Sequence, residues 1–189
     1  MSPDGAARLW RAESMVRHDR LRALDELEAC FRDGEPPVDL EGRLDGRLVT
    51  GTLGSGLDAV LEGATRLWLP WRGKAFDPAT NQGRNRFDGG ARPFFRLLWP
   101  GYDDLEPEGP GAFTAFRFDT SLGNSVTHPD LAVLRIDYDH PESPWPIRLI
   151  LDELVQVGDG QHLGQALMRR SGGFRRVAWF ALQVPERSA

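Results

Sequence analysis

Residues 151–184 read LDELVQVGDGQHLGQALMRRSGGFRRVAWFALQV, a stretch with three short runs of branched and aromatic residues. The runs cover 151–157, 162–170 and 175–184. Asp159-Gly160 separates the first two runs and is a strong signal for a two-residue hairpin turn. The glycine-rich segment at 171–173 predicts a second hairpin. Three strands joined by two hairpins predict an antiparallel sheet at this end of the chain.

Strand signals of the same kind continue towards the N-terminus. Short runs rich in aromatic or branched residues are bounded by Gly, Pro, Asp or Asn at 42–51, 66–71, 92–99, 112–120 and 131–139. Many short strands with turn signals between them favour an antiparallel barrel or sandwich. We therefore predict a mainly β fold, with an antiparallel β-barrel domain over residues 39–186.

The first part of the chain has a helical period instead. Leu24, Leu27 and Phe31 recur at i, i+3 and i+7, which places them on one face of a helix. Gly34 and then Pro36-Pro37 follow, and this order is typical of a helix end. We predict an N-terminal helical segment over residues 1–38, which either caps the barrel or forms a homodimer contact.

A second, short capping helix is predicted after Ser55. Leu57, Val60, Leu61 and Ala64 would share one of its faces. Ser55 is a suitable N-cap, because its hydroxyl can accept a hydrogen bond from a free backbone N–H of the first turn.

Composition and charge exclude several classes of protein. The 189-residue chain has a net charge of −5 and no basic stripe that could neutralise phosphates, so a nucleic-acid partner is not expected. Its longest apolar runs, such as 177–182, are too short to cross a bilayer. The first residues lack the apolar stretch of a signal peptide, and Cys30 is the only cysteine. We expect a cytoplasmic protein without an intrachain disulfide.

Lys74 is the only lysine among 23 Lys and Arg residues, and it lies in Trp71-Arg72-Gly73-Lys74-Ala75-Phe76. A lysine beside glycine and aromatic residues can point its ammonium into a barrel mouth, where it would pair with an anionic head group. A compact point charge fits there better than a forked guanidinium. The alternative is that its stem packs over Trp71 and its ammonium stays in water.

Two strands carry charge on one face and apolar residues on the other. Phe116 and Phe118 alternate with Arg117 and Asp119, and Tyr138 lies on the apolar side of 131–139. The favoured interpretation puts the charges in solvent and the aromatic residues in the core. The alternative turns some of the charges into the barrel towards a polar ligand head group, where buried arginines would need their carboxylate partners.

Asp152 and Glu153 are adjacent in an otherwise apolar strand, so alternation sends one of these carboxylates into the barrel. An inward Asp152 either acts as a general base or pairs with an arginine.

Residues 42–46, GRLDG, and 71–76, WRGKAF, together resemble the GXWXG family of small bacterial proteins. In that family a Gly-x-Trp-x-Gly strand precedes a Trp-x-Gly-Lys-x-Phe element. Leu44 stands where the family has tryptophan, whereas the second element matches in full. The resemblance covers roughly residues 40–184. It implies a calycin-like barrel, the architecture of lipocalins, fatty-acid-binding proteins and nitrobindin-like haem proteins, but no settled activity.

These observations predict a barrel that binds a hydrophobic small molecule in its lumen, and this molecule is anionic if Lys74 pairs with its head group. No cofactor or metal is predicted. One alternative is a barrel enzyme, an isomerase or cyclase for a lipid- or polyketide-like substrate, with Asp152 and Tyr138 as the acid/base pair. A second alternative is a haem protein with His162 as the iron ligand. The predicted ligand-binding residues are Trp71, Lys74, Phe76, Phe116, Tyr138 and Asp152.

Overall fold

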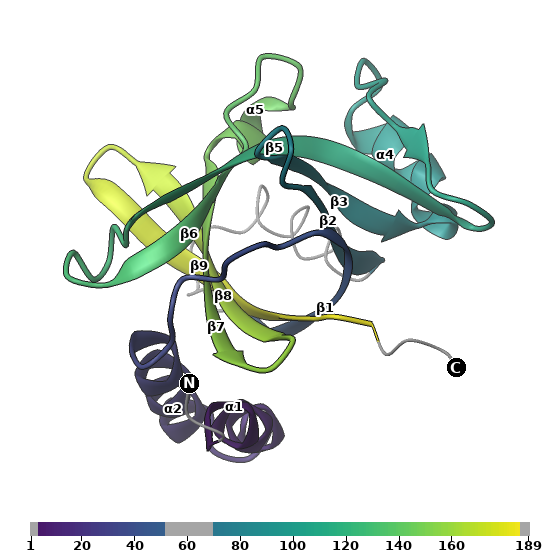
Figure 1. Cartoon of the computed structure of the whole chain (residues 1–189). Helices are drawn as coiled ribbons and strands as arrows, with labels where there is room; N and C mark the ends of the chain where they lie inside the picture. Colours follow the sequence, from purple (N-terminus) through teal and green to yellow (C-terminus); the bar gives the residue numbers. More distant parts are fainter. Residues whose placement is uncertain (1–3, 52–69, 186–189) are drawn as a thin grey trace.

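The strands pair in chain order around a ring (Figure 1). A computed structural model describes residues 4–51 and 70–185. Within this part of the chain β3 pairs with β5 and β9 pairs with β1, and these two pairings close an eight-stranded antiparallel barrel. The mainly β prediction is confirmed. The strands of the ring are β1 (Gly42–Gly51), β2 (Trp71–Asp77), β3 (Gln82–Asp88), β5 (Ala112–Asn124), β6 (Ala132–Asp137), β7 (Ile150–Gly158), β8 (Gln161–Arg170) and β9 (Gly173–Gln183).

Both C-terminal hairpins are confirmed. Gly158 pairs with Gln161, so Asp159-Gly160 forms the turn between β7 and β8, and Gly160 has a φ of +61° that glycine tolerates without strain. Arg170 pairs with Gly173 at the start of β9, which places the second turn at 171–172.

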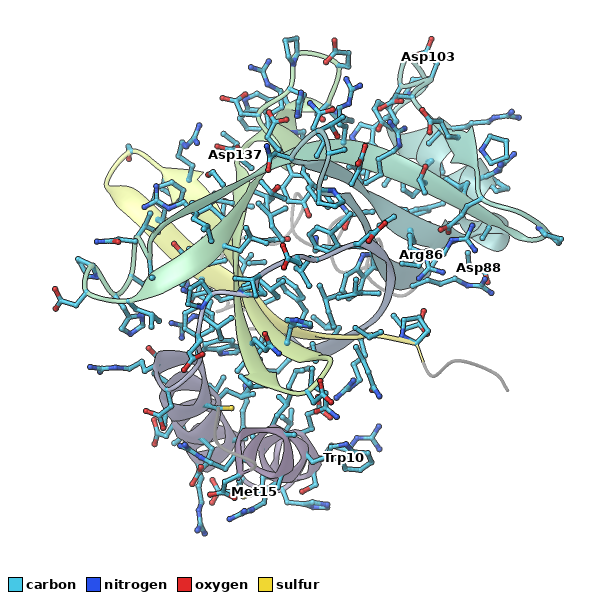
Figure 2. All side chains as sticks on the ribbon, viewed as in Figure 1. Trp10, Met15, Arg86, Asp88, Asp103 and Asp137 are labelled. Atoms are coloured by element: carbon cyan, nitrogen blue, oxygen red, sulfur yellow. The ribbon has the colours of Figure 1, made fainter. Side chains whose placement is uncertain are left out.

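Two N-terminal helices, α1 (Asp4–Met15) and α2 (Arg20–Arg32), lie side by side against the outside of the barrel (Figure 1). Leu27 and Phe31 of the predicted stripe are buried against Trp179 of β9, with the ring centroids of Phe31 and Trp179 5.4 Å apart. Trp10 projects from α1 and is 65% exposed (Figure 2). The division at residue 38 and a homodimer contact stay predictions.

The segment predicted as a strand at 92–99 is helical, so this prediction was wrong. It forms α4 (Arg92–Leu98), which follows the short 3-10 turn η1 (Gly89–Ala91). Pro93 suits the first turn of a helix, where its missing N–H has no intrahelical partner. Phe95 contacts Trp99, four residues on, and packs onto the barrel core. A short apolar run does not by itself distinguish a strand from a helix.

Two other predictions concern residues that the structure does not describe. The short helix after Ser55 and residues 66–69 of the strand predicted at 66–71 lie outside the described ranges. A strand that the sequence did not predict, β3, is rich in polar residues and pairs with both β2 and β5.

The barrel interior is filled mainly by aromatic and aliphatic side chains. Alternation along each strand sends every second side chain inward, so Phe118 is buried while Arg117 is exposed. At Arg117 and Phe118 the structure therefore has the predicted arrangement, with the charge in solvent and the aromatic ring in the core. The inward residues include Leu44, Phe76, Phe87, Phe118, Ile136, Leu154 and Phe180.

The acidic loop at 102–111 is bound to β3 by ion pairs. Arg84 contacts Asp104 at 2.6 Å, and Arg86 contacts Glu108 at 2.9 Å. The loop contains the short strand β4 (Glu106–Pro107), which pairs with β5. A further short helix, α5 (Trp145–Arg148), precedes β7. No helix in the described residues is long and apolar enough to span a membrane.

Gly73, the glycine of the WRGKAF element, offers a test of how tightly β1 and β2 pack. Its φ is +131°, and a Cβ added there would lie 2.0 Å from the carbonyl oxygen of Leu44. We expect Gly73→Ala to lower the free energy of unfolding by about 2–4 kcal/mol. Gly172→Ala is the control, since a Cβ there meets no atom within 4 Å among the described residues. Urea unfolding measures both; equal stability of the two variants would contradict this packing.

Candidate functional site

A cluster of polar side chains lies inside the apolar barrel around the single lysine. Lys74 is 2% exposed, and its Nζ donates hydrogen bonds to Asp152 Oδ2 at 2.8 Å, to Asn85 Oδ1 at 3.0 Å and to the hydroxyl of Tyr138. Lys74 comes from β2, Asn85 from β3 and Asp152 from β7, and Tyr138 follows β6 directly. The barrel therefore brings together four side chains from four separate segments of the chain, and we call them the Lys74 cluster.

Only one of the two carboxylate oxygens of Asp152 accepts hydrogen bonds from the described residues. Its Oδ2 accepts hydrogen bonds from Lys74 and, at 2.9 Å, from the hydroxyl of Tyr138. Its Oδ1 is buried and has no hydrogen-bond partner among the described residues. An unsatisfied buried carboxylate oxygen is costly, so a hydrogen-bond donor beside this atom would be favourable.

Asn85 connects the cluster to the barrel wall, and the sequence analysis did not single it out. Its Oδ1 accepts hydrogen bonds from Lys74 and, at 3.1 Å, from the indole N–H of Trp71. Its Nδ2 donates to the carbonyl oxygen of Phe116 at 3.5 Å. The only sequence signal is the inward alternation of Gly83, Asn85 and Phe87, which the flanking arginines obscure.

Phe116 is the extra residue of a β-bulge next to Asn85. Arg84 pairs with Arg117 whereas Asn85 pairs with Ala115, so Phe116 has no partner in the ladder. Its φ is +53°, an uncommon and strained conformation for a bulky side chain. The N–H of Phe116 donates to the Tyr102 hydroxyl at 2.6 Å, and its carbonyl oxygen accepts from Asn85 Nδ2. The bulge thus fixes which way the Asn85 amide points.

Aromatic rings surround the ammonium of Lys74. Its Nζ lies 5.1 Å from the ring centroid of Tyr138 and 5.7 Å from that of Trp71. These distances allow cation–π attraction, which is stronger where water is excluded. The rings within reach belong to Trp71, Phe118, Tyr138 and Phe180.

Burial shifts the protonation equilibria of the cluster. Loss of hydration lowers the pKa of Lys74, and the adjacent Asp152 carboxylate opposes part of that shift. Loss of hydration, together with Asp152, raises the pKa of Tyr138 well above its usual value. Tyr138 therefore stays a proton donor, whereas the amine of Lys74 loses its proton more readily than an exposed lysine does.

The predicted site residues are only partly brought together. Trp71, Lys74, Tyr138 and Asp152 meet in the cluster, so the partner of Asp152 is the lysine and not an arginine. Lys74 does not extend its ammonium into water. Phe76 packs beside the cluster on Phe118, whereas Phe116 contributes through its backbone. Whether any of these residues binds a ligand stays a prediction.

Glu153, the neighbour of Asp152, points to the opposite face and is also buried. It accepts hydrogen bonds from Ser125 Oγ and the Val126 N–H at 2.6 Å, and from Gln165 Nε2 at 2.7 Å. With three donors this carboxylate is satisfied by the protein. Alternation placed the two acids correctly, but the sequence did not show that both are buried.

His162 and Cys30 are buried outside the cluster. Burial lowers the pKa of His162 to about 4, so its imidazole is neutral at pH 7, and its Nδ1 has no hydrogen-bond partner among the described residues. Burial raises the pKa of Cys30 to about 11, which keeps it a thiol. A role of His162 as a haem ligand stays a prediction.

An open cleft on the surface reaches the indole of Trp71. Its volume is about 560 Å³, and Asp88 on its wall is labelled in Figure 2. Trp71 faces this cleft and also donates its N–H to Asn85 of the cluster. The cleft is lined by Pro70, Trp71, Arg72, Asp88, Gly90, Ala91 and Phe94.

Comparison with known proteins gives a fold and no family. No family model and no curated protein matches the chain. The crystal structure of a protein from Thermomonospora curvata is similar, with a TM-score of 0.51 and 15% sequence identity; the match covers 95% of this chain and 99% of that chain. This identity shows the fold alone. The barrel is compatible with a calycin-like architecture, and the resemblance to the GXWXG family stays a prediction.

The Lys74–Asp152 pair can be tested by a double-mutant cycle. Lys74→Met leaves a buried carboxylate without its counter-charge, and we expect a loss of about 3–5 kcal/mol of unfolding free energy. Lys74→Met combined with Asp152→Leu removes both charges, and we expect it to recover at least about 2 kcal/mol of that loss. Urea denaturation of the wild-type protein, Lys74→Met, Asp152→Leu and the double variant measures the coupling energy between the two charges. Additive effects would show that the two charges do not depend on each other.

His162 gives a pH dependence of known sign. Burial lowers its pKa in the folded protein from the ordinary 6.5 to about 4, so between these values the unfolded chain binds more protons and stability falls as the pH falls. We expect this group to remove about 2 kcal/mol between pH 7 and pH 5. His162→Gln should reduce the loss of unfolding free energy between pH 7 and pH 5, which urea unfolding at the two pH values measures. His18→Gln, at an exposed position, is the control, and an identical pH dependence of stability in both variants would contradict the assignment.

Proposed function

We propose that the barrel binds a hydrophobic small molecule and places a neutral polar head group at the Lys74 cluster. The observation that carries this proposal is Asp152 Oδ1, a buried carboxylate oxygen without a hydrogen-bond partner among the described residues. Specific small-molecule sites combine a mostly apolar lining with a few fixed polar groups. The aromatic residues around Lys74 and the one unused oxygen of Asp152 fit that description.

The charge balance of the cluster favours a neutral head group over an anionic one. Asp152 already offsets the charge of Lys74 at 2.8 Å. A ligand carboxylate would add a second negative charge beside one positive charge, with little water to screen the repulsion. A hydroxyl group, in contrast, can donate to Asp152 Oδ1 and adds no charge. Alcohols with a long alkyl or isoprenoid chain are therefore the favoured ligand class.

The cleft beside Trp71 supports an approach route for such a molecule. On one side Trp71 lines the open cleft, and on the other its N–H reaches the oxygen of Asn85 that also binds Lys74. The indole of Trp71 therefore contacts both the cleft and the cluster.

A second candidate function is a barrel enzyme, an isomerase or a cyclase. The 2.9 Å hydrogen bond between the Tyr138 hydroxyl and Asp152 Oδ2 favours it, because a phenol donor beside a carboxylate acceptor can exchange protons with a bound substrate. In this reading Tyr138 is the acid, Asp152 is the base, and Lys74 holds the carboxylate in place.

The choice of head group can be tested with octanol and octanoate, which share one alkyl chain. We expect octanol to change the tryptophan fluorescence saturably and to bind at least about tenfold more tightly than octanoate, a difference of about 1.4 kcal/mol. Asp152→Asn removes the negative charge that offsets Lys74, so this variant should shift the preference towards octanoate. Asp159→Asn, in the exposed β7–β8 turn, is the matched control.

Two results would contradict the proposal. Tighter binding of octanoate than of octanol by the wild-type protein would show that the head group is anionic. Absence of saturable binding for both compounds would show that the cluster is not a binding site for molecules of this class.

A further inference from the structure

We propose that Lys74 forms an imine with the carbonyl carbon of an aldehyde or a ketone held at the cluster. This inference rests on the proposed small-molecule binding and extends it from a hydrogen-bonded head group to a reactive one. Its basis is the placement of one amine, one carboxylate and one phenol around a common point. No other lysine exists in the chain.

Imine formation needs an unprotonated amine, and the cluster can supply it without a change in total charge. Lys74 Nζ lies 2.8 Å from Asp152 Oδ2, so the ammonium can pass a proton directly to the carboxylate. Burial, which lowers the pKa of Lys74, acts in the same direction.

The reaction balances with groups that the cluster contains. The lone pair of Nζ attacks the carbonyl carbon, the C=O π electrons move to oxygen, and this oxygen takes a proton from Tyr138 or from protonated Asp152. The nitrogen returns one N–H proton to the group that protonated the oxygen, which gives the neutral carbinolamine. That group then protonates the hydroxyl, water leaves, and the nitrogen lone pair forms the C=N bond of a protonated imine. One amine and one carbonyl compound give one imine and one water, without oxidant or reductant.

Asp152 Oδ1, which accepts no hydrogen bond from the described residues, has a role in this reaction. Tyr138 and Lys74 occupy Oδ2, whereas Oδ1 is buried and free of partners among the described residues. A carbinolamine on Nζ carries a new hydroxyl close to this carboxylate, and that hydroxyl can donate to Oδ1. The intermediate would thus satisfy an oxygen that the described protein groups leave unpaired.

The product also suits the charges around it. A protonated imine is a cation at the position of the ammonium, so it keeps Asp152 as its counter-charge. The rings of Phe118 and Phe180, whose centroids lie 5.2 Å from Nζ, face this cation as they face the ammonium.

A chain with one lysine allows a direct test by reductive trapping. The folded protein is incubated at pH 7 with octanal and sodium cyanoborohydride, which reduces an imine to a stable secondary amine. The reactive amines are Lys74 and the α-amino group of the chain, and peptide mapping by mass spectrometry separates them. We expect octyl labelling of Lys74 to be faster than labelling of the α-amino group, and octanol to slow only the labelling of Lys74.

Three controls define the roles of the residues. Lys74→Arg keeps the charge and should leave only the α-amino group to be labelled. Tyr138→Phe keeps the amine but removes the phenolic proton donor, and we expect trapping at Lys74 to slow by about 100-fold. Wild-type protein unfolded in guanidinium chloride should lose the preference for Lys74. If Lys74→Arg does not fold, the peptide map of the wild-type protein still decides the site.

The outcomes separate the two proposals. Labelling of the α-amino group alone in the folded protein overturns the imine. If octanol binds saturably in that case, the proposed small-molecule binding stands and only the proposed imine at Lys74 is wrong. If octanol does not bind and Lys74 is not labelled, both proposals are wrong.

Discussion

The contact between Lys74 Nζ and Asp152 Oδ2 places two opposite charges in an interior filled mainly by aromatic and aliphatic side chains. Either charge alone would lose its hydration without compensation, so each depends on the other and on added hydrogen bonds. Tyr138 and Asn85 supply those bonds from the end of β6 and from β3. The pair therefore requires the barrel to close with these strands in register. Because desolvation of both charges is costly, a buried charge pair of this kind adds little net stability compared with apolar residues of the same size.

The bulge at Phe116 connects this pair to the surface. Its backbone leaves the β3–β5 ladder, and its N–H and C=O are taken by Tyr102 and Asn85. The amide of Asn85 is thereby oriented with its oxygen towards Lys74. Tyr102 begins the acidic loop, which arginines of β3 hold in place. Strain in one residue thus positions a group of the cluster, as is common at functional sites.

The fold was predictable wherever the signal is local. Turns such as Asp159-Gly160 and the apolar stripe of α2 follow from neighbouring residues, and the structure has both. The segment at 92–99 was misassigned, because a short apolar run fits a strand or a helix until its packing is known. The strand β3 was missed, since its outward arginines are balanced by a loop that lies elsewhere in the sequence.

The sequence by itself determined the alternating strands, the hairpins and the opposite directions of Asp152 and Glu153, because these depend on a period of two and on turn chemistry. It also made Lys74 conspicuous as the single lysine. Only the tertiary structure decided that Lys74 and Asp152, 78 residues apart, are partners. It also decided that Asn85 completes their cluster. The reason is physical: local patterns fix which way a side chain points, whereas closure of the barrel fixes what it meets.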